Sequence, residues 1–197
     1  MAIQTNIIFC WFGGKEKPLK VKECIETWHE YMPDYNYIEL NENNFDVNIN
    51  KFTRQAYDLK KWAFVSDVAR LWGLYAYGGI YMDTDVTVYQ PLDQFLKHKV
   101  FTGFQEPHYP VTATMGAEQG NELIKEMLEL YTDREFKLMP RLDMYENNTR
   151  LLSDIIGKYI DRDKDEYQEC NKIAVYPSET FCRGGYTRHN MFFSWRD

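Results

Sequence analysis

Several patterns that would assign a chemistry at once are missing from the sequence. The four cysteines form no C-x-x-C pair and no zinc spacing, and the four histidines are scattered along the chain. There is no G-x-G-x-x-G dinucleotide fingerprint and no phosphate-binding loop ending in G-K-S/T. These absences argue against a zinc hydrolase, a Rossmann dinucleotide enzyme and a P-loop nucleotidase. We expect the cysteines to be reduced and partly buried.

The chain also has no excess of basic residues, no long apolar run and no signal-peptide pattern at its start. Its net charge of -7 argues against a non-specific polyanion binder, so we expect no nucleic-acid partner. A small phosphate ligand stays compatible with this charge, because a bound cation would reverse the local field. No apolar stretch is long enough to span a bilayer. We expect a cytoplasmic protein, either free or held at the inner face of a membrane through partners.

The pattern of strands and helices predicts one layered α/β domain over residues 1–197. The hydrophobic fraction of 44% and the charged fraction of 27% are typical of a globular protein. Strands and helices alternate in the first half, which favours parallel strand pairing there. The predicted strands are 3–12, 35–40, 80–82, 86–89, 100–105, 111–117 and 173–176, and the predicted helices are 18–31, 51–57, 60–77, 119–131 and 149–160.

The most informative stretch is WAFVSDVARLWGLYAYGGIYMDTDV, at residues 62–86. A helix is followed by two glycines, which suit a helix end that needs positive φ, and then by a short apolar strand. The strand leads into Asp83 and Asp85, whose side chains point the same way because side chains alternate along an extended segment. Two ionised carboxylates at the end of a buried strand need a partner, and a hard divalent cation is the obvious one.

Other candidate residues near this stretch allow two interpretations each. Asp67 and Arg70 are three positions apart in the predicted helix, and by spacing alone they form an ordinary ion pair. Trp11 follows the first strand, where α/β proteins tend to bind ligands. It is equally well explained as a core residue or as a flat surface on which a nucleotide base stacks.

These residue types suit the transfer of a sugar from a nucleoside diphosphate. The leaving group is a diphosphate, and a bound Mn²⁺ or Mg²⁺ neutralises its charge well. A D-x-D pair alone is a weak signal, since acidic pairs are common in turns. Its context of helix, two glycines, apolar strand, D-x-D and second strand makes it stronger. We interpret it as a metal and sugar-nucleotide site.

The segment SDVARLWGLYAYGGIYMDTDV resembles the signature of glycosyltransferase family 32, the family with the DXD sugar-binding motif. This family includes bacterial capsular polysaccharide transferases and yeast initiating mannosyltransferases, and the large clostridial glucosylating toxins are more distant relatives. The segments IIFCWFGGK, 24–33, YPSETF and HNMFFSW are similar to the same family in the same order. The resemblance implies a GT-A fold, a single Rossmann-like domain with a mixed, mainly parallel sheet flanked by helices. It also implies that the tail, residues 177–197, closes over the active site.

The resemblance further implies metal-dependent, retaining transfer from a UDP-sugar to a glycan acceptor, in capsular or cell-surface polysaccharide synthesis. Trp11 would stack on the uracil, Asp83 would contact the ribose and the sugar, and Asp85 would ligate Mn²⁺ or Mg²⁺. The implied catalytic residues are Asp67, Arg70, Asp83 and Asp85. The implied donor-binding residues are Trp11, Phe12, Gly13, Ser66, Asp67, Arg70, Asp83, Ser194 and Trp195. The implied metal ligands are Asp83, Asp85, Asn190 and Ser194.

The tail departs from the family pattern at one position. The family has two consecutive histidines before three variable residues and Ser-Trp, and the second histidine position faces the metal. This chain has His189-Asn190 there. An asparagine oxygen binds a hard cation less strongly than histidine does, and we expect His189 to be structural, although it could substitute. The departure keeps open an alternative, a non-catalytic carbohydrate- or nucleotide-binding protein on a degenerate transferase fold. A metal-dependent phosphoesterase is a weaker third interpretation.

Overall fold

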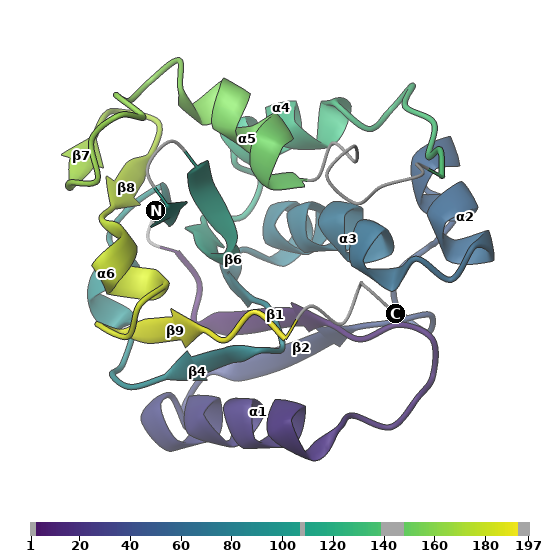
Figure 1. Ribbon diagram of the computed structural model, residues 1–197, viewed down its shortest axis with the longest axis horizontal. Coiled ribbons are helices and arrows are strands. Elements are labelled where there is room, and N and C mark those ends of the chain that lie inside the picture. The colour runs from purple at the N-terminus through teal and green to yellow at the C-terminus, as the bar shows by residue number, and fades with distance from the viewer. Residues whose placement is uncertain (1–2, 107–108, 139–147, 193–197) are drawn as a thin grey trace.

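The computed structural model in Figure 1 describes residues 3–106, 109–138 and 148–192. Its strands are β1 (Asn6–Cys10), β2 (Asn36–Leu40), β3 (Gly79–Met82), β4 (Val86–Val88), β5 (Val100–Glu106), β6 (Tyr109–Ala117), β7 (Gln168–Glu169), β8 (Ala174–Tyr176) and β9 (Thr187–His189). Its helices are α1 (Leu19–Tyr31), α2 (Lys51–Asp58), α3 (Trp62–Tyr77), α4 (Glu122–Glu129), α5 (Asn148–Ile156) and α6 (Ser178–Phe181), with a short 3₁₀ helix at Asp93–Phe95.

A mixed sheet forms the centre of the described structure, with seven strands in the order β2-β1-β3-β6-β5-β8-β7. Strand β1 pairs in parallel with both β2 and β3, which confirms the parallel pairing predicted for the first half. The sheet then changes direction, because β6 runs antiparallel to both β3 and β5. The predicted fold class, a mixed α/β sheet flanked by helices, is confirmed.

Helices cover both faces of this sheet (Figure 1). Helix α3 packs against β1 and β3 on one side, and α4 packs on α3 in turn. On the other side α1 packs against β4, which forms a separate two-stranded sheet with β9, and Trp28 of α1 also contacts Phe9 of β1. The indole nitrogen of Trp28 donates a 2.6 Å hydrogen bond to the Val86 carbonyl. Strand β3 is buried on both faces: Tyr81 contributes to one core cluster, and Ile80 to the other. This double burial explains why its sequence is a continuous apolar run.

The two glycines between α3 and β3 set the direction in which β3 enters the sheet. Gly78 and Gly79 have φ angles of +63° and +130°, a region that residues with a side chain rarely adopt. A Cβ atom on Gly79 would lie 2.5 Å from the Asn6 carbonyl oxygen of the neighbouring strand. The chain therefore needs glycine here both for the turn and for the close approach to β1.

Most of the predicted elements are present, and the main difference lies in the tail. Strand β9 was not predicted, because three residues are too few for a readable alternation. It pairs antiparallel with β4, and its last residue, His189, lies opposite Val86. The helix predicted over 149–160 is shorter and ends at Ile156.

The structure also describes the state of the cysteines and the character of the helices. The four cysteines are thiols, and three of them are buried while the fourth, Cys170, is partly buried, as predicted. None of the helices in the three described ranges has the length and apolar character needed to cross a membrane.

Candidate functional site

The D-x-D turn lies at the edge of the sheet where three parallel strands end. Trp11 follows β1, Asn41 follows β2, and Asp83 follows β3. Because the carboxyl ends of parallel strands meet at the same edge, the topology brings these segments to one side of the molecule. The turn is fixed by two backbone hydrogen bonds, from Asp83 N–H to the Ala113 carbonyl at 2.8 Å and from Val86 N–H to the Asp83 carbonyl at 3.0 Å.

The inner half of the site consists of Asp67, Arg70 and Asp83. Arg70 lies on the buried face of α3, and its side chain is only 8% exposed. Its Nη2 atom lies 3.3 Å from Asp67 Oδ1 and 3.2 Å from Asp83 Oδ1. Its Nη1 donates to the carbonyl and hydroxyl oxygens of Thr112 at 3.1 and 3.0 Å, and its Nε donates to the Ser66 carbonyl at 3.3 Å. Every N–H direction of the guanidinium thus faces a protein acceptor, so Arg70 holds the two carboxylates in place.

Tyr81 and Cys10 lie next to the charged groups of the inner half. The Tyr81 hydroxyl donates a 2.8 Å hydrogen bond to Asp83 Oδ1, and the Arg70 guanidinium carbon lies 4.6 Å from the centre of the Tyr81 ring. Burial raises the pKa of the Cys10 thiol to about 12, although the nearby Arg70 acts in the opposite direction. The thiol is therefore protonated at neutral pH and adds no charge to the inner half.

Asp67 has an unusually high pKa for an aspartate. Its pKa is raised from 3.8 to about 6, chiefly by burial; Arg70 opposes this shift and the negative charge of Asp83 adds to it. The group therefore ionises close to neutral pH. Buried carboxylates with such shifts are concentrated at functional sites, because a structure rarely tolerates their cost elsewhere.

The outer half of the site consists of Asp85, His189 and the backbone of Phe192. Asp85 Oδ2 accepts a 2.9 Å hydrogen bond from the Phe192 N–H, and Oδ1 lies 3.3 Å from His189 Nε2. Burial opposes ionisation of Asp85, but His189 and the Phe192 N–H outweigh it and lower the pKa of the carboxyl. Burial likewise disfavours the charged histidine, yet Asp85 raises the pKa of His189 above its usual value of 6.5. The two side chains therefore stabilise each other's charged forms.

The two halves meet in one group of ligand atoms. One atom each from Asp83, Asp85 and His189 lies within 4.8 Å of the others, and all three side chains are partly exposed. Two carboxylate oxygens and one imidazole nitrogen are a donor set that suits a divalent ion such as Mn²⁺. The Nδ1 atom of His189 is buried and has no hydrogen-bond partner among the described residues. The residues present thus fit a divalent cation.

The amide nitrogen of Asn190 bonds to the segment next to this group of ligand atoms. Its amide nitrogen donates to the Asp85 carbonyl at 2.9 Å and to the Thr87 hydroxyl at 2.8 Å, so it braces the turn and β4. Neighbouring residues of an extended chain point to opposite sides, and here His189 is the one that reaches the carboxylates. The sequence favours a structural role for His189 and leaves open that it substitutes for the missing histidine, and only the β4–β9 pairing reveals its direction. The other predicted tail residues, Ser194 and Trp195, lie outside the described residues.

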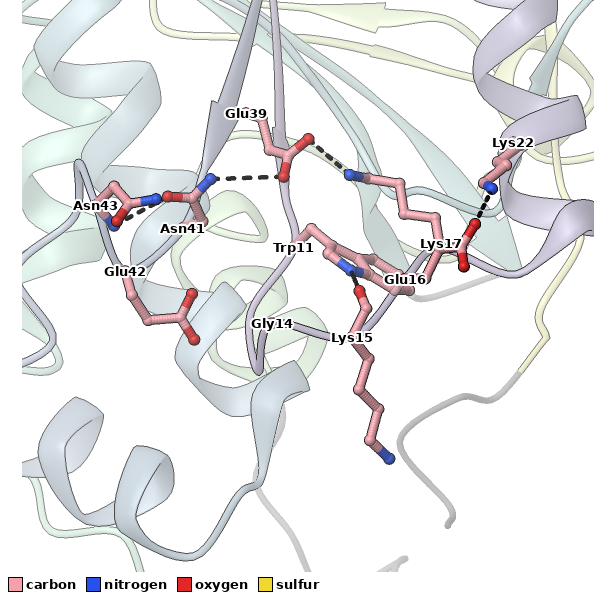
Figure 2. Close-up of a pocket in the computed structure, with 10 residues that line it drawn as sticks. All are labelled: Trp11, Gly14, Lys15, Glu16, Lys17, Lys22, Glu39, Asn41, Glu42 and Asn43. Carbon is pink, nitrogen blue, oxygen red and sulfur yellow. Dashed lines mark hydrogen bonds and ion pairs between the residues drawn. The ribbon is translucent and has the colours of Figure 1, made fainter.

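A cavity of about 360 Å³ lies beside Trp11 (Figure 2). Trp11 is partly exposed and donates a 2.6 Å hydrogen bond from Nε1 to the Lys15 carbonyl. Lys17 Nζ lies 5.5 Å from the centre of the indole ring and forms a 2.7 Å ion pair with Glu39. The residues that line the cavity are Trp11, Gly14, Lys15, Glu16, Lys17, Lys22, Glu39, Asn41, Glu42 and Asn43. The D-x-D aspartates are not among them, so the cavity and the ligand-atom group are two separate parts of one sheet edge.

The remaining predicted donor-binding residues support this edge in different ways. Phe12 is buried, and its ring packs edge-on against Phe45 with centroids 5.9 Å apart, so it belongs to the core. Gly13 donates a 2.7 Å hydrogen bond from its N–H to Glu42 Oε1, and a Cβ there would lie 2.7 Å from the Trp62 ring.

Comparison with known proteins defines the class of the molecule. Residues 18–102 match the family model described as "Glycosyltransferase sugar-binding region containing DXD motif", a little under half of the chain. The matched segment includes α3, β3 and the D-x-D turn. The match covers the segment that carries the D-x-D turn, and the protein is a transferase enzyme. The family implies a nucleotide-sugar donor and a glycan acceptor.

Two solved structures share the fold. "PaToxG Glycosyltransferase" superposes with a TM-score of 0.60 at 17% identity, over 81% of this chain and 70% of that chain. A glycosyltransferase involved in the glycosylation of the major capsid of PBCV-1 superposes with a TM-score of 0.52 at 13% identity, over 97% of this chain and 96% of that one. At these identities the likeness concerns the fold. A comparison with curated protein sequences gave no match.

Proposed function

We propose that the protein is a metal-dependent, retaining glycosyltransferase that moves a sugar from a UDP-sugar to a glycan acceptor, in capsular or cell-surface polysaccharide synthesis. The observation that carries the metal and donor assignment is the group of ligand atoms formed by Asp83, Asp85 and His189. The UDP donor, retention and the polysaccharide role rest on the resemblance to family 32.

In this proposal the outer half together with Asp83 holds the cation, and Asp67 and Arg70 of the inner half hold the sugar. Asp83, Asp85 and His189 would bind Mn²⁺ or Mg²⁺. When bound, such a cation neutralises the charge that develops on the diphosphate leaving group. The Asp67 carboxylate accepts hydrogen bonds from donor-sugar hydroxyls, and Arg70 keeps this carboxylate and Asp83 at a fixed separation. The charged groups are thereby positioned before the donor binds, which is how electrostatic stabilisation is most effective.

The cavity beside Trp11 is the proposed site for the nucleotide base. The indole ring is partly exposed and borders the cavity together with Asn41, and both follow the ends of parallel strands. Replacing Trp11 with Ala should weaken UDP binding by about 1–3 kcal/mol, the usual contribution of one base stacked on an aromatic ring. The affinity for Mn²⁺-pyrophosphate should stay unchanged, because that probe has no base. Unchanged UDP binding would show that Trp11 does not bind the base.

The experiment that tests the whole proposal is calorimetry with UDP, with and without Mn²⁺, on the wild type and on Asp85→Asn. We expect metal-dependent UDP binding and Mn²⁺-stimulated donor hydrolysis in the wild type. Both should be lost in Asp85→Asn, which keeps the shape of the side chain but removes its charge. Asp58→Asn is the matched control, since Asp58 forms an exposed ion pair with Arg54 on α2.

The outcomes separate the proposal from its alternatives. Full donor hydrolysis by Asp85→Asn would refute the site assignment. Metal-dependent binding of UDP without hydrolysis or transfer from any nucleotide sugar would favour the non-catalytic binding protein. A screen of UDP-glucose, UDP-galactose, UDP-N-acetylglucosamine and GDP-mannose identifies the base and the sugar at the same time.

A further inference from the structure

Asn148 connects three elements behind the inner half of the site. It is the first residue of α5 and is 2% exposed. Its Nδ2 donates a 3.3 Å hydrogen bond to the carbonyl oxygen of Asp67, and its Oδ1 accepts a 3.1 Å hydrogen bond from the Tyr131 hydroxyl. Tyr131 follows α4 and is itself 1% exposed. A buried amide with partners at both ends ties α3, α4 and α5 together at the residue that carries the Asp67 carboxylate.

The N-terminus of α5 also acts on that carboxylate directly. A backbone hydrogen bond from Asn148 to the Asp67 carboxyl group opposes the effect of burial on this group. The first N–H groups of a helix have no partner within the helix, and the helix dipole favours negative charge there. Asp67 is thus bound to Arg70 within α3 and to Asn148 at the start of α5. Asn148 therefore contacts Asp67 twice, through its side chain at the carbonyl oxygen and through its backbone at the carboxyl group, although the two residues are 81 positions apart.

We propose that Asn148, held by Tyr131, is a positioning residue that fixes the Asp67 carboxylate for the donor sugar. This inference rests on the proposed function, in which Asp67 contacts sugar hydroxyls while other residues bind the nucleotide. A buried hydrogen bond that served stability alone would affect nucleotide and nucleotide-sugar binding equally. A positioning role predicts a selective loss, because only the sugar depends on where Asp67 lies.

The variants are Asn148→Ala, Tyr131→Phe and the double variant, with Ser153→Ala as the control. Ser153 lies on the same helix, is 1% exposed, and donates a 2.6 Å hydrogen bond to the Thr149 carbonyl within α5. The control therefore removes a buried hydrogen bond of α5 that does not reach Asp67. Tyr131→Phe removes one hydroxyl and keeps the ring, so it tests the same contact with little change in packing.

The measurement is calorimetry with UDP and with the nucleotide sugar that the wild type hydrolyses fastest in the four-member screen, both with Mn²⁺. We expect Asn148→Ala to weaken nucleotide-sugar binding roughly tenfold or more and to leave UDP binding unchanged, which matches the loss of a buried hydrogen bond near a charged group. Tyr131→Phe should give a smaller loss of the same kind. The double variant should equal Asn148→Ala, because the two side chains act through one contact.

Three results would overturn the inference while leaving the proposed function intact. The first is an equal loss of affinity for UDP and for the nucleotide sugar in Asn148→Ala. The second is a loss in Ser153→Ala that affects the nucleotide sugar alone. The third is unchanged binding of both ligands in Tyr131→Phe, together with either no loss or an equal loss for both ligands in Asn148→Ala. A wild type that binds no nucleotide sugar with Mn²⁺ would refute both. If Asn148→Ala does not fold, Tyr131→Phe alone decides between a selective and an unselective effect.

Discussion

The inner and outer halves of the site hold their carboxylates by different means. In the inner half Asp67 and Asp83 share one arginine, which is charged at any accessible pH and has a protein acceptor in every N–H direction. In the outer half Asp85 is balanced by a histidine and a backbone N–H. Histidine can lose its charge near neutral pH, so another cation can replace it as the positive partner of Asp85.

The difference assigns a task to each half. Arg70 is permanently charged and all its N–H groups have acceptors, so it holds Asp67 in one position. This suits a carboxylate that must bind a sugar in one orientation. His189 can lose its proton when a metal ion binds, which suits an ion that binds and leaves with each nucleotide. The inner half should therefore dominate the stability of the fold, and the outer half should dominate metal affinity.

Removing the inner arginine is expected to have the largest effect. Arg70→Ala leaves the buried Asp67 and the partly exposed Asp83 without their cation and should lower the free energy of unfolding by about 3–5 kcal/mol, as for other broken buried ion pairs. Urea unfolding measures it. Arg54→Ala is the matched control, because its partner Asp58 is also on the same helix but the pair is half-exposed, and it should cost about 1 kcal/mol or less. Equal losses of unfolding free energy in the two variants would show that Arg70 does not stabilise the inner half more than an exposed ion pair stabilises a helix.

The cost of ionising Asp67 should be visible as a pH dependence of stability. Its pKa is about 6 in the folded protein and 3.8 for an unperturbed aspartate, so between these values the folded state binds more protons. Stability contributed by this group is therefore lost as the pH rises from about 4 to above 6, by about 3 kcal/mol. Asp67→Asn should lack this loss. Unfolding free energies of both proteins across this range test it, and parallel curves would contradict a raised pKa.

The smallest of these effects separates His189 from its neighbour. His189→Ala should weaken Mn²⁺ binding roughly tenfold, about 1.4 kcal/mol, through the loss of one ligand. Asn190→Ala should weaken it less, since its amide braces the Asp85 backbone and Thr87. Titration of Mn²⁺ followed by electron paramagnetic resonance measures both without turnover. A larger loss in Asn190→Ala would restore the role predicted for Asn190 from the sequence.

Most residues of the inner half could be predicted from the sequence, because they lie close together in one segment of the chain. Asp67 and Arg70 are three positions apart on a helix, and the glycines, the apolar strand and the D-x-D turn follow without a gap. Helical spacing and strand alternation are geometric rules, so they place these side chains before any tertiary contact is known. What the spacing missed is that one arginine joins both aspartates, since the strand must fold back beside the helix for this contact.

The outer half and the Asn148 contact were not readable from spacing. Asp85 and Asn190 are 105 positions apart, and the direction of His189 depends on the register of a three-residue strand. A shift of one residue in that register would turn His189 away and Asn190 inward. Short strands carry little periodicity, so no local rule could have chosen between the two.

The sequence by itself determined the fold class, the parallel first half of the sheet, the helix–strand unit and the transferase class. These follow from local patterns whose geometry is the same in any protein. Only the tertiary structure decided which tail residue joins the carboxylates, how Arg70 is divided between two aspartates, and that α5 supports Asp67. Those contacts link distant segments, and their geometry depends on how the sheet edges pair and how the helices pack.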